Sequence, residues 1–246
     1  MRLATRLVAH RGEMHDCPEN TRAALRHAIS RGARYVEFDI QLTRDHVPVV
    51  FHDEPLLRTT GQAGLITEFS AAEASAISAH EPARLGERFT GERIPTLSQF
   101  VALLNATPEV TAFVELKRQS IERFGVRICL EALADALRGA SFDWVLISFE
   151  HEAVTLGREQ LSRPIGWVLR EYDDASRVAA EALAPEYLFC DWHQLPDSAE
   201  ALWPGRWKWV IYDVEDAELA QALLRRGASL IETGRIDHLI DETSQP

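Results

Sequence analysis

The sequence predicts an α/β protein with a (β/α)₈ barrel, a β-hairpin and a small insertion after the second strand. Short apolar strands alternate with helical segments, which favours a parallel sheet. Eight strands are expected once the second arm of the hairpin is set aside, and the 246 residues suit one barrel, a fold that commonly takes about 200–250 residues as one domain. We therefore expect a single domain over residues 1–246, with an open doubly wound sheet as the alternative.

The first elements form a strand, helix and strand. An apolar strand is expected at residues 7–9. The segment Pro18-Glu19-Asn20-Thr21 then opens a helix that runs to about Ser30, with Asn20 or Thr21 as its N-cap and Gly32 near its stop. The strand at 35–40 follows. No glycine-rich dinucleotide motif follows the first strand, which lowers the open-sheet alternative.

A hairpin is expected next, because the polar segment between the strands at 35–40 and 47–51 is too short for a crossover helix. If the turn centres between Arg44 and Asp45, antiparallel pairing places Glu37 opposite His52. From 54 to 96 the alternation breaks down, and we expect an insertion with one helix.

Regular alternation returns after the insertion. Strands are expected at 112–117, 145–149, 164–169, 187–190, 208–212 and 229–232, and helices at 96–104, 121–137, 151–159, 174–183 and 217–226. In such a barrel the chemistry lies where the strands end, at the C-terminal mouth. The pairs His10 with Arg11, Glu37 with Asp39, and Glu115 with Lys117 come at three strand ends and are expected to converge there.

Composition and net charge limit the molecules that this chain is expected to bind. The formal net charge is −12 and the basic clusters are short, so nucleic acid and anionic membranes are poor partners. No stretch is long and apolar enough for stable membrane insertion or for a signal peptide. Cys17, Cys129 and Cys190 match no metal-ligand spacing and suggest free thiols, so we expect a cytoplasmic protein.

Three acidic side chains are the candidate metal ligands. Glu37, Asp39 and Glu115 offer hard oxygen ligands from two strand ends, which suits Mg²⁺ or Ca²⁺. Without a cation they would repel one another, and at least one would stay protonated. The alternative is that each is a solvated carboxylate at a strand end, but the two matching strand ends favour the metal.

Two histidines are candidates for acid and base catalysis. Imidazole titrates near neutral pH, so His10 and His52 can act as general acid and base. Alternatively, His52 is a hydrogen-bonded hairpin residue and His10 caps a loop. Two histidines at one rim favour catalysis.

Positive charge at the mouth points to an anionic substrate. Arg11 and Lys117 suit a phosphate group, although they also could neutralise Asp53 and Glu115. Trp209 is a candidate for the substrate pocket, with packing inside the protein as the commoner role of a strand tryptophan.

Taken together, these residues resemble the glycerophosphodiester phosphodiesterase family. The matching segments are AHRG at 9–12, PENT at 18–21, EFDIQLTRDHVPVVFHD at 37–53, RTTG at 58–61, GERIPTL at 91–97, ELK at 115–117 and ISF at 147–149. The order HRG, EFD, HD and ELK is the specific part of the resemblance. The chain departs from the family pattern at Trp209 to Tyr212, where the family tryptophan is usually followed by Thr, Val and Asn, and at Thr233 to Ile236.

The resemblance implies a barrel that hydrolyses a small glycerophosphodiester to sn-glycerol 3-phosphate and an alcohol. By matching positions it implies His10 and His52 as acid and base, a divalent ion on the three carboxylates, and Arg11 with Lys117 on the phosphate. The nucleophile is either the glycerol 2-hydroxyl, through a cyclic phosphate, or a metal-bound water.

Two other functions are alternatives. Lysophospholipase D-like hydrolysis of longer lipids needs an apolar lip, for which the insertion offers Leu56, Leu57, Leu65, Ile66 and Phe69. A non-catalytic phosphoester-binding protein would have lost a site residue, and none is lost. The sequence leaves the oligomeric state, the metal and the preferred alcohol open.

Overall fold

Eight parallel strands form a closed barrel in the computed structural model, which describes residues 3–197 and 200–244. The strands are β1 (Leu7–Ala9), β2 (Tyr35–Leu42), β4 (Thr111–Leu116), β5 (Asp143–Ser148), β6 (Ile165–Val168), β7 (Tyr187–Asp191), β8 (Lys208–Tyr212) and β9 (Leu230–Thr233). Each pairs with the next in this order, and β1 closes the ring by pairing with both β2 and β9. The predicted (β/α)₈ barrel is confirmed.

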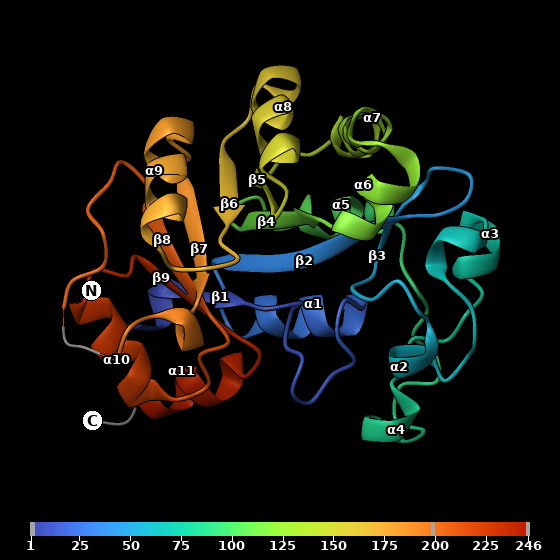
Figure 1. The fold of residues 1–246 in the computed structure, drawn as a ribbon. Coiled ribbons are helices and arrows are strands. Elements are labelled where there is room, and N and C mark those ends of the chain that lie inside the picture. Colours follow the sequence, from blue (N-terminus) through green and yellow to red (C-terminus); the bar gives the residue numbers. More distant parts are fainter. Residues whose placement is uncertain (1–2, 198–199, 245–246) are drawn as a thin grey trace.

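Helices surround the barrel on the outside (Figure 1). They are α1 (Arg22–Ser30), α5 (Leu97–Leu104), α6 (Arg118–Phe124), α7 (Val126–Leu137), α8 (His151–Leu161), α9 (Asp174–Leu183), α10 (Ala217–Arg225) and α11 (Ile236–Ser244), with 3₁₀ turns η1 (Leu3–Arg6) and η3 (Trp192–Gln194). The helix expected at 121–137 is two helices, because Gly125 adopts a φ of +86° and breaks the first. Within the described ranges, no helix has the length and apolar character needed to cross a membrane.

Side chains alternate between two buried layers along each strand. One layer fills the barrel interior and contains Val8, Phe113, Val145, Ile147, Val168, Phe189, Val210 and Leu230. The other packs the outer face of the strands against the helices. Phe113 lies at the centre of the interior, with its ring 4.9 Å from that of Tyr187 and 5.1 Å from that of Phe189. The interior is therefore a packed core.

The hairpin is present, but the predicted register is wrong by one residue. Strand β3 (Pro48–Val50) pairs with β2 so that Ile40 lies opposite Val50 and Leu42 opposite Pro48. The turn centres on Asp45, because the Thr43 N–H donates to the Val47 carbonyl and His46 adopts a φ of +60°. Glu37 therefore does not face His52 across the hairpin.

The insertion after β3 holds three short helices where one was expected. These are α2 (Leu57–Thr60), α3 (Ala71–Ala74) and α4 (Pro82–Leu85), together with the 3₁₀ turn η2 (Ile66–Glu68), and they lie at one side of the barrel (Figure 1). Leu56 and Ile66 are fully buried in a small core of the insertion, while Leu57 is 63% exposed. Most of the apolar side chains proposed for a lipid-binding lip thus pack within the insertion.

Candidate active site

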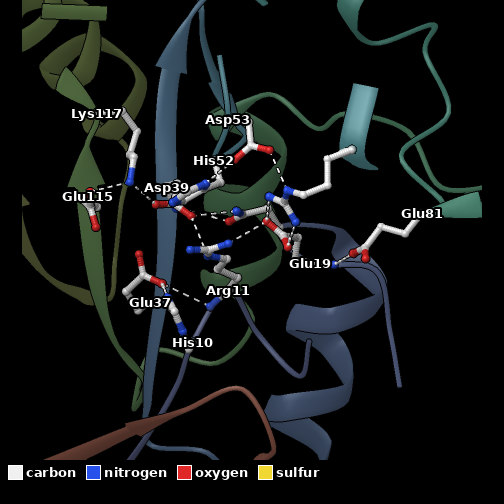
Figure 2. Close-up of polar contacts among 12 residues, drawn as sticks. His10, Arg11, Glu19, Glu37, Asp39, His52, Asp53, Glu81, Glu115 and Lys117 are labelled. Carbon is white, nitrogen blue, oxygen red and sulfur yellow. Dashed lines mark hydrogen bonds and ion pairs between the residues drawn. The ribbon is translucent and has the colours of Figure 1, made fainter. Parts of the chain in front are cut away.

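Six of the predicted site residues meet at the mouth of the barrel, as the strand-end argument expected. His10 and Arg11 follow β1, Glu37 and Asp39 lie on β2, and Glu115 and Lys117 lie at the end of β4. Register places Asp39 level with Glu115. Figure 2 shows Asp39 between the side chains of Lys117 and Arg11, with Glu37 and His10 beside them.

The three acidic side chains come close enough to share one ion. Glu37, Asp39 and Glu115 each offer an oxygen atom, and these atoms lie within 4.8 Å of one another. Glu37 and Asp39 are only 2% and 1% exposed. Burying three carboxylates together costs free energy unless positive charge lies nearby.

Two cationic side chains supply part of that charge. The Lys117 ammonium lies 2.7 Å from a Glu115 oxygen and 3.1 Å from Asp39 Oδ1. Arg11 Nε lies 3.2 Å from Asp39 Oδ2, which also accepts a hydrogen bond from the Asn20 amide at 2.8 Å. Burial alone would raise the pKa of Asp39, but Lys117 and Arg11 hold it well below its usual range.

The Glu37 carboxylate has fewer donors and less positive charge beside it than Asp39 has. Its Oε2 accepts a hydrogen bond from the Arg11 backbone N–H at 3.1 Å, but its buried Oε1 has no hydrogen-bond partner among the described residues. Burial and the nearby Asp39 charge raise the pKa of Glu37 well above its usual value, and burial also raises the pKa of Glu115. A buried carboxylate oxygen that lacks a donor, within a set of hard oxygen ligands, fits a divalent cation such as Mg²⁺ or Ca²⁺.

His10 lies among further carboxylates. Its Nε2 is 3.6 Å from Glu232 Oε1 and 3.9 Å from Glu37 Oε2, and its Nδ1 is 3.5 Å from Asp213 Oδ1. Burial and the positive charge of Arg11 lower the pKa of His10 to about 3. The imidazole is therefore neutral at physiological pH, which is the state in which it accepts a proton.

His52 is oriented by a chain of ion pairs. Its Nδ1 lies 2.6 Å from Asp53 Oδ1, and the other Asp53 oxygen accepts a hydrogen bond from Arg58 Nε at 2.6 Å. Partial burial opposes ionisation, but the bonds from His52 and Arg58 hold the pKa of Asp53 below its usual range. Because Nδ1 is engaged, Nε2 is the ring nitrogen available for chemistry.

Arg58 also connects the His52–Asp53 pair to Arg11, through the Glu19 carboxylate. It donates two hydrogen bonds to the buried Glu19 carboxylate, at 2.6 and 2.8 Å, and Arg11 donates a third at 2.9 Å. Sequence reasoning quoted Glu19 and Arg58 within the PENT and RTTG motifs but gave them no role. The alternative role of Arg11, neutralising Asp53, is taken by Arg58, whereas the matching alternative for Lys117, an ion pair with Glu115, is present.

A cavity of about 160 Å³ opens between these groups. Both histidines, Arg11, Lys117 and Glu115 line it, and Phe149, Tyr212, Asp213 and Glu232 line other parts of its wall. Sequence reasoning missed Asp213 and Glu232. The signal was present, because Glu232 is a carboxylate within the apolar last strand and Asp213 directly follows β8, so both come at strand ends like the residues that were found.

Trp209 does not line the cavity, and the substrate-pocket interpretation of this residue is corrected. It is 4% exposed and packs in the outer layer, where its Nε1 donates to the Trp203 carbonyl. Strand alternation explains this, because the next residue, Val210, faces the barrel interior. Tyr212 takes the expected place in the cavity wall.

Known proteins are similar to this chain in sequence. Residues 10–200 match the profile of the glycerophosphoryl diester phosphodiesterase family. A glycerophosphodiester phosphodiesterase of Caldanaerobacter subterraneus subsp. tengcongensis is 29% identical over 247 residues, which cover 97% of this chain and 98% of that protein. Glycerophosphodiester phosphodiesterase 1 of Mus musculus is 44% identical over 94 residues, which cover 38% of this chain and 28% of that protein.

Solved structures share the barrel. An Oleispira antarctica phosphodiesterase in complex with its product sn-glycerol-3-phosphate superposes with a TM-score of 0.85 and 23% identity, covering 98% of this chain and 97% of that one. A Silicibacter pomeroyi protein described as a glycerophosphoryl diester phosphodiesterase gives a TM-score of 0.79 at 20% identity, covering 97% and 94% of the two chains. At these identities the likeness shows the fold.

Proposed function

The chain belongs to the glycerophosphoryl diester phosphodiesterase family of enzymes, and from this premise we propose that its barrel mouth hydrolyses glycerophosphodiesters to sn-glycerol 3-phosphate and an alcohol. The observation that carries the proposal is that two histidines and two cations line one cavity beside three buried carboxylates. This set of side chains can bind a phosphodiester, deprotonate a hydroxyl and protonate a leaving alcohol.

Glu37, Asp39 and Glu115 would hold a divalent cation, Mg²⁺ or Ca²⁺. Such an ion, when bound, supplies Lewis-acid stabilisation of charge that grows on the phosphoryl oxygens. The unpartnered Oε1 of Glu37 supports this assignment.

Arg11 and Lys117 would bind the phosphate. Both side chains line the same cavity, and Arg11 Nε, although it lies 3.2 Å from Asp39 Oδ2, forms no hydrogen bond with the described residues. Lys117 has three N–H donors, two of which face Glu115 and Asp39. Donors placed in advance around a phosphoryl group stabilise the transition state without reorganisation.

The two histidines would divide the proton transfers. His10, which burial keeps neutral, would take the proton from the attacking hydroxyl. His52, whose Nδ1 lies against the Asp53 carboxylate, would give a proton to the oxygen of the departing alcohol. Because the Asp53 carboxylate engages Nδ1, Nε2 is the ring nitrogen that would deliver this proton.

The direct test is to measure release of sn-glycerol 3-phosphate from a panel of glycerophosphodiesters. The panel is run on enzyme treated with EDTA, and then with Mg²⁺ or Ca²⁺ added back. We expect turnover that EDTA abolishes and a divalent ion restores. Full turnover after exhaustive EDTA treatment would contradict the metal assignment, and no turnover with any ion would contradict the activity.

A further inference from the structure

A second hollow adjoins the catalytic cavity. It has a volume of about 200 Å³ and shares Glu115, Lys117 and Phe149 with the catalytic cavity. Its remaining wall is formed by Arg118, Gln119 and Arg170. A phosphodiester held by Lys117 would therefore have this outer hollow next to its phosphate.

One carboxylate holds both arginines of the outer hollow in place. Glu150 lies 3.1 Å from Arg118 Nε and 2.5 Å from Arg170 Nη2. The three residues follow the neighbouring strands β4, β5 and β6, so they meet at one part of the barrel rim. The two guanidinium side chains are 47% and 49% exposed, which leaves them open to a ligand.

The charge and aromatic surface of the outer hollow oppose a quaternary ammonium group. Each carboxylate there already faces a cation: Glu150 lies against both guanidinium groups, Glu122 lies 3.5 Å from Arg118 Nε, and Glu115 lies against Lys117. Phe149 offers the aromatic ring of this wall, but the Arg170 guanidinium already lies 5.6 Å from the centre of that ring. A trimethylammonium group would have to displace one cation from the ring and lie beside another.

The inner cavity suits the other arm of the substrate. Its far wall carries Tyr212, Asp213 and Glu232, whose oxygen atoms can accept or donate hydrogen bonds to hydroxyl groups. Its volume of about 160 Å³ is small, and its deep wall is closed by buried side chains such as Phe189. A short constant group such as glycerol fits there, and the variable alcohol is left to the outer hollow.

Resting on the phosphodiesterase function proposed above, we propose that the outer hollow binds the alcohol portion of the substrate. Arg118 and Arg170 select alcohols that carry a carboxylate or several hydroxyl groups over alcohols that end in a quaternary ammonium. The guanidinium groups donate hydrogen bonds to the first class and repel the second.

The test is to measure kcat and KM for glycerophosphoserine, glycerophosphoinositol and glycerophosphocholine with the metal-loaded enzyme. We expect the wild type to have about fivefold higher kcat/KM for the first two, the size of effect that half-exposed charges give. Arg170→Gln should raise their KM about fivefold with kcat little changed, and should lower the KM for the choline ester, because it removes a repelling charge and frees the Phe149 ring. Arg118→Gln, at the start of α6, should act in the same direction and keeps the test open if the first variant does not fold.

Arg177→Gln is the matched control. Arg177 is also half-exposed and ion-paired, to Glu181 on α9, but it does not line either cavity. It should leave all three substrates unchanged. Equal substrate ratios in the wild type and both cavity variants, or a wild-type preference for the choline ester, would overturn the subsite while the phosphodiesterase function stands. Failure of the wild type to cleave any of the three esters would overturn that function, and the subsite with it.

Discussion

The barrel interior and the barrel mouth are both buried, but they are built from opposite kinds of side chain. In the interior, Phe113 and Val210 are fully buried among apolar neighbours, and their removal from water stabilises the fold. At the mouth, Asp39 and Lys117 are 1% and 8% exposed and carry charges whose burial costs free energy. The interior therefore stabilises the fold, whereas the mouth retains charged side chains whose burial costs free energy because the chemistry needs them.

The largest expected effect on activity comes from the mouth. His52→Ala, and separately His10→Ala, should lower kcat for a glycerophosphodiester by about 10²–10⁴-fold, because each removes a general acid or base. The measurement is steady-state release of sn-glycerol 3-phosphate, with circular dichroism to show that the variants fold. Full turnover in either variant would remove that histidine from the mechanism.

The largest expected effect on stability comes from the interior. Phe113→Ala should lower the free energy of unfolding by about 3–5 kcal/mol, because it opens a cavity beside Tyr187 and Phe189. Urea unfolding measures this change, and the kcat of the folded fraction should fall far less than in His52→Ala. If Phe113→Ala lost as much turnover as the histidine variant and kept its stability, this would contradict the view that the interior supports stability and the mouth carries the chemistry.

A smaller effect concerns how the free energy of unfolding depends on pH, which a buried carboxyl group at the mouth should influence. Burial and Asp213 raise the pKa of Glu232 well above its ordinary value of 4.5. Above that pH the unfolded chain loses a proton that the folded chain keeps, so this group lowers the free energy of unfolding as pH rises. Glu232→Gln removes the group. In EDTA, its stability relative to wild type should therefore grow by up to about 1.4 kcal/mol per pH unit from about pH 4.5 upward, until the folded carboxyl also ionises.

Urea unfolding at several pH values measures this difference. Glu159→Gln, at an exposed position on α8, is the control for replacing a carboxylate by an amide away from the mouth, and the trend of Glu232→Gln should exceed it. A constant difference for Glu232→Gln would mean that the buried carboxyl ionises as easily in the folded protein as in the unfolded chain.

The fold and the core of the site could be predicted because both follow from local patterns. Alternating strands and helices indicated the barrel, and parallel strands bring their ends to one mouth, so the positions of His10, Glu37 and Glu115 followed. Glu232 was missed although it obeys the same rule. Leu230 and Ile231 precede it in β9 and no histidine, lysine or arginine lies beside it in the strand, so its neighbours indicate only an apolar strand.

The predictions that failed concern features that depend on the three-dimensional structure and not on local sequence patterns. The hairpin register depends on the backbone of His46 and on the hydrogen bond from Thr43 to Val47, which spacing does not reveal. The direction of Trp209 depends on which residues of β8 face the interior, and a continuous apolar strand gives no alternation to decide it. Gly125 breaks a helix whose apolar pattern continues on both sides.

The central claim, that the mouth keeps its buried carboxylates to hold a divalent ion, is tested most directly by isothermal titration of the EDTA-treated, dialysed protein with Mg²⁺ and Ca²⁺. We expect one bound ion per chain, and at least tenfold weaker binding in Glu37→Gln, which removes a ligand. Gln has nearly the same size and shape as Glu, so the substitution should change the packing of the site little. Equal affinity in both proteins, or no binding to the wild type, would contradict the claim.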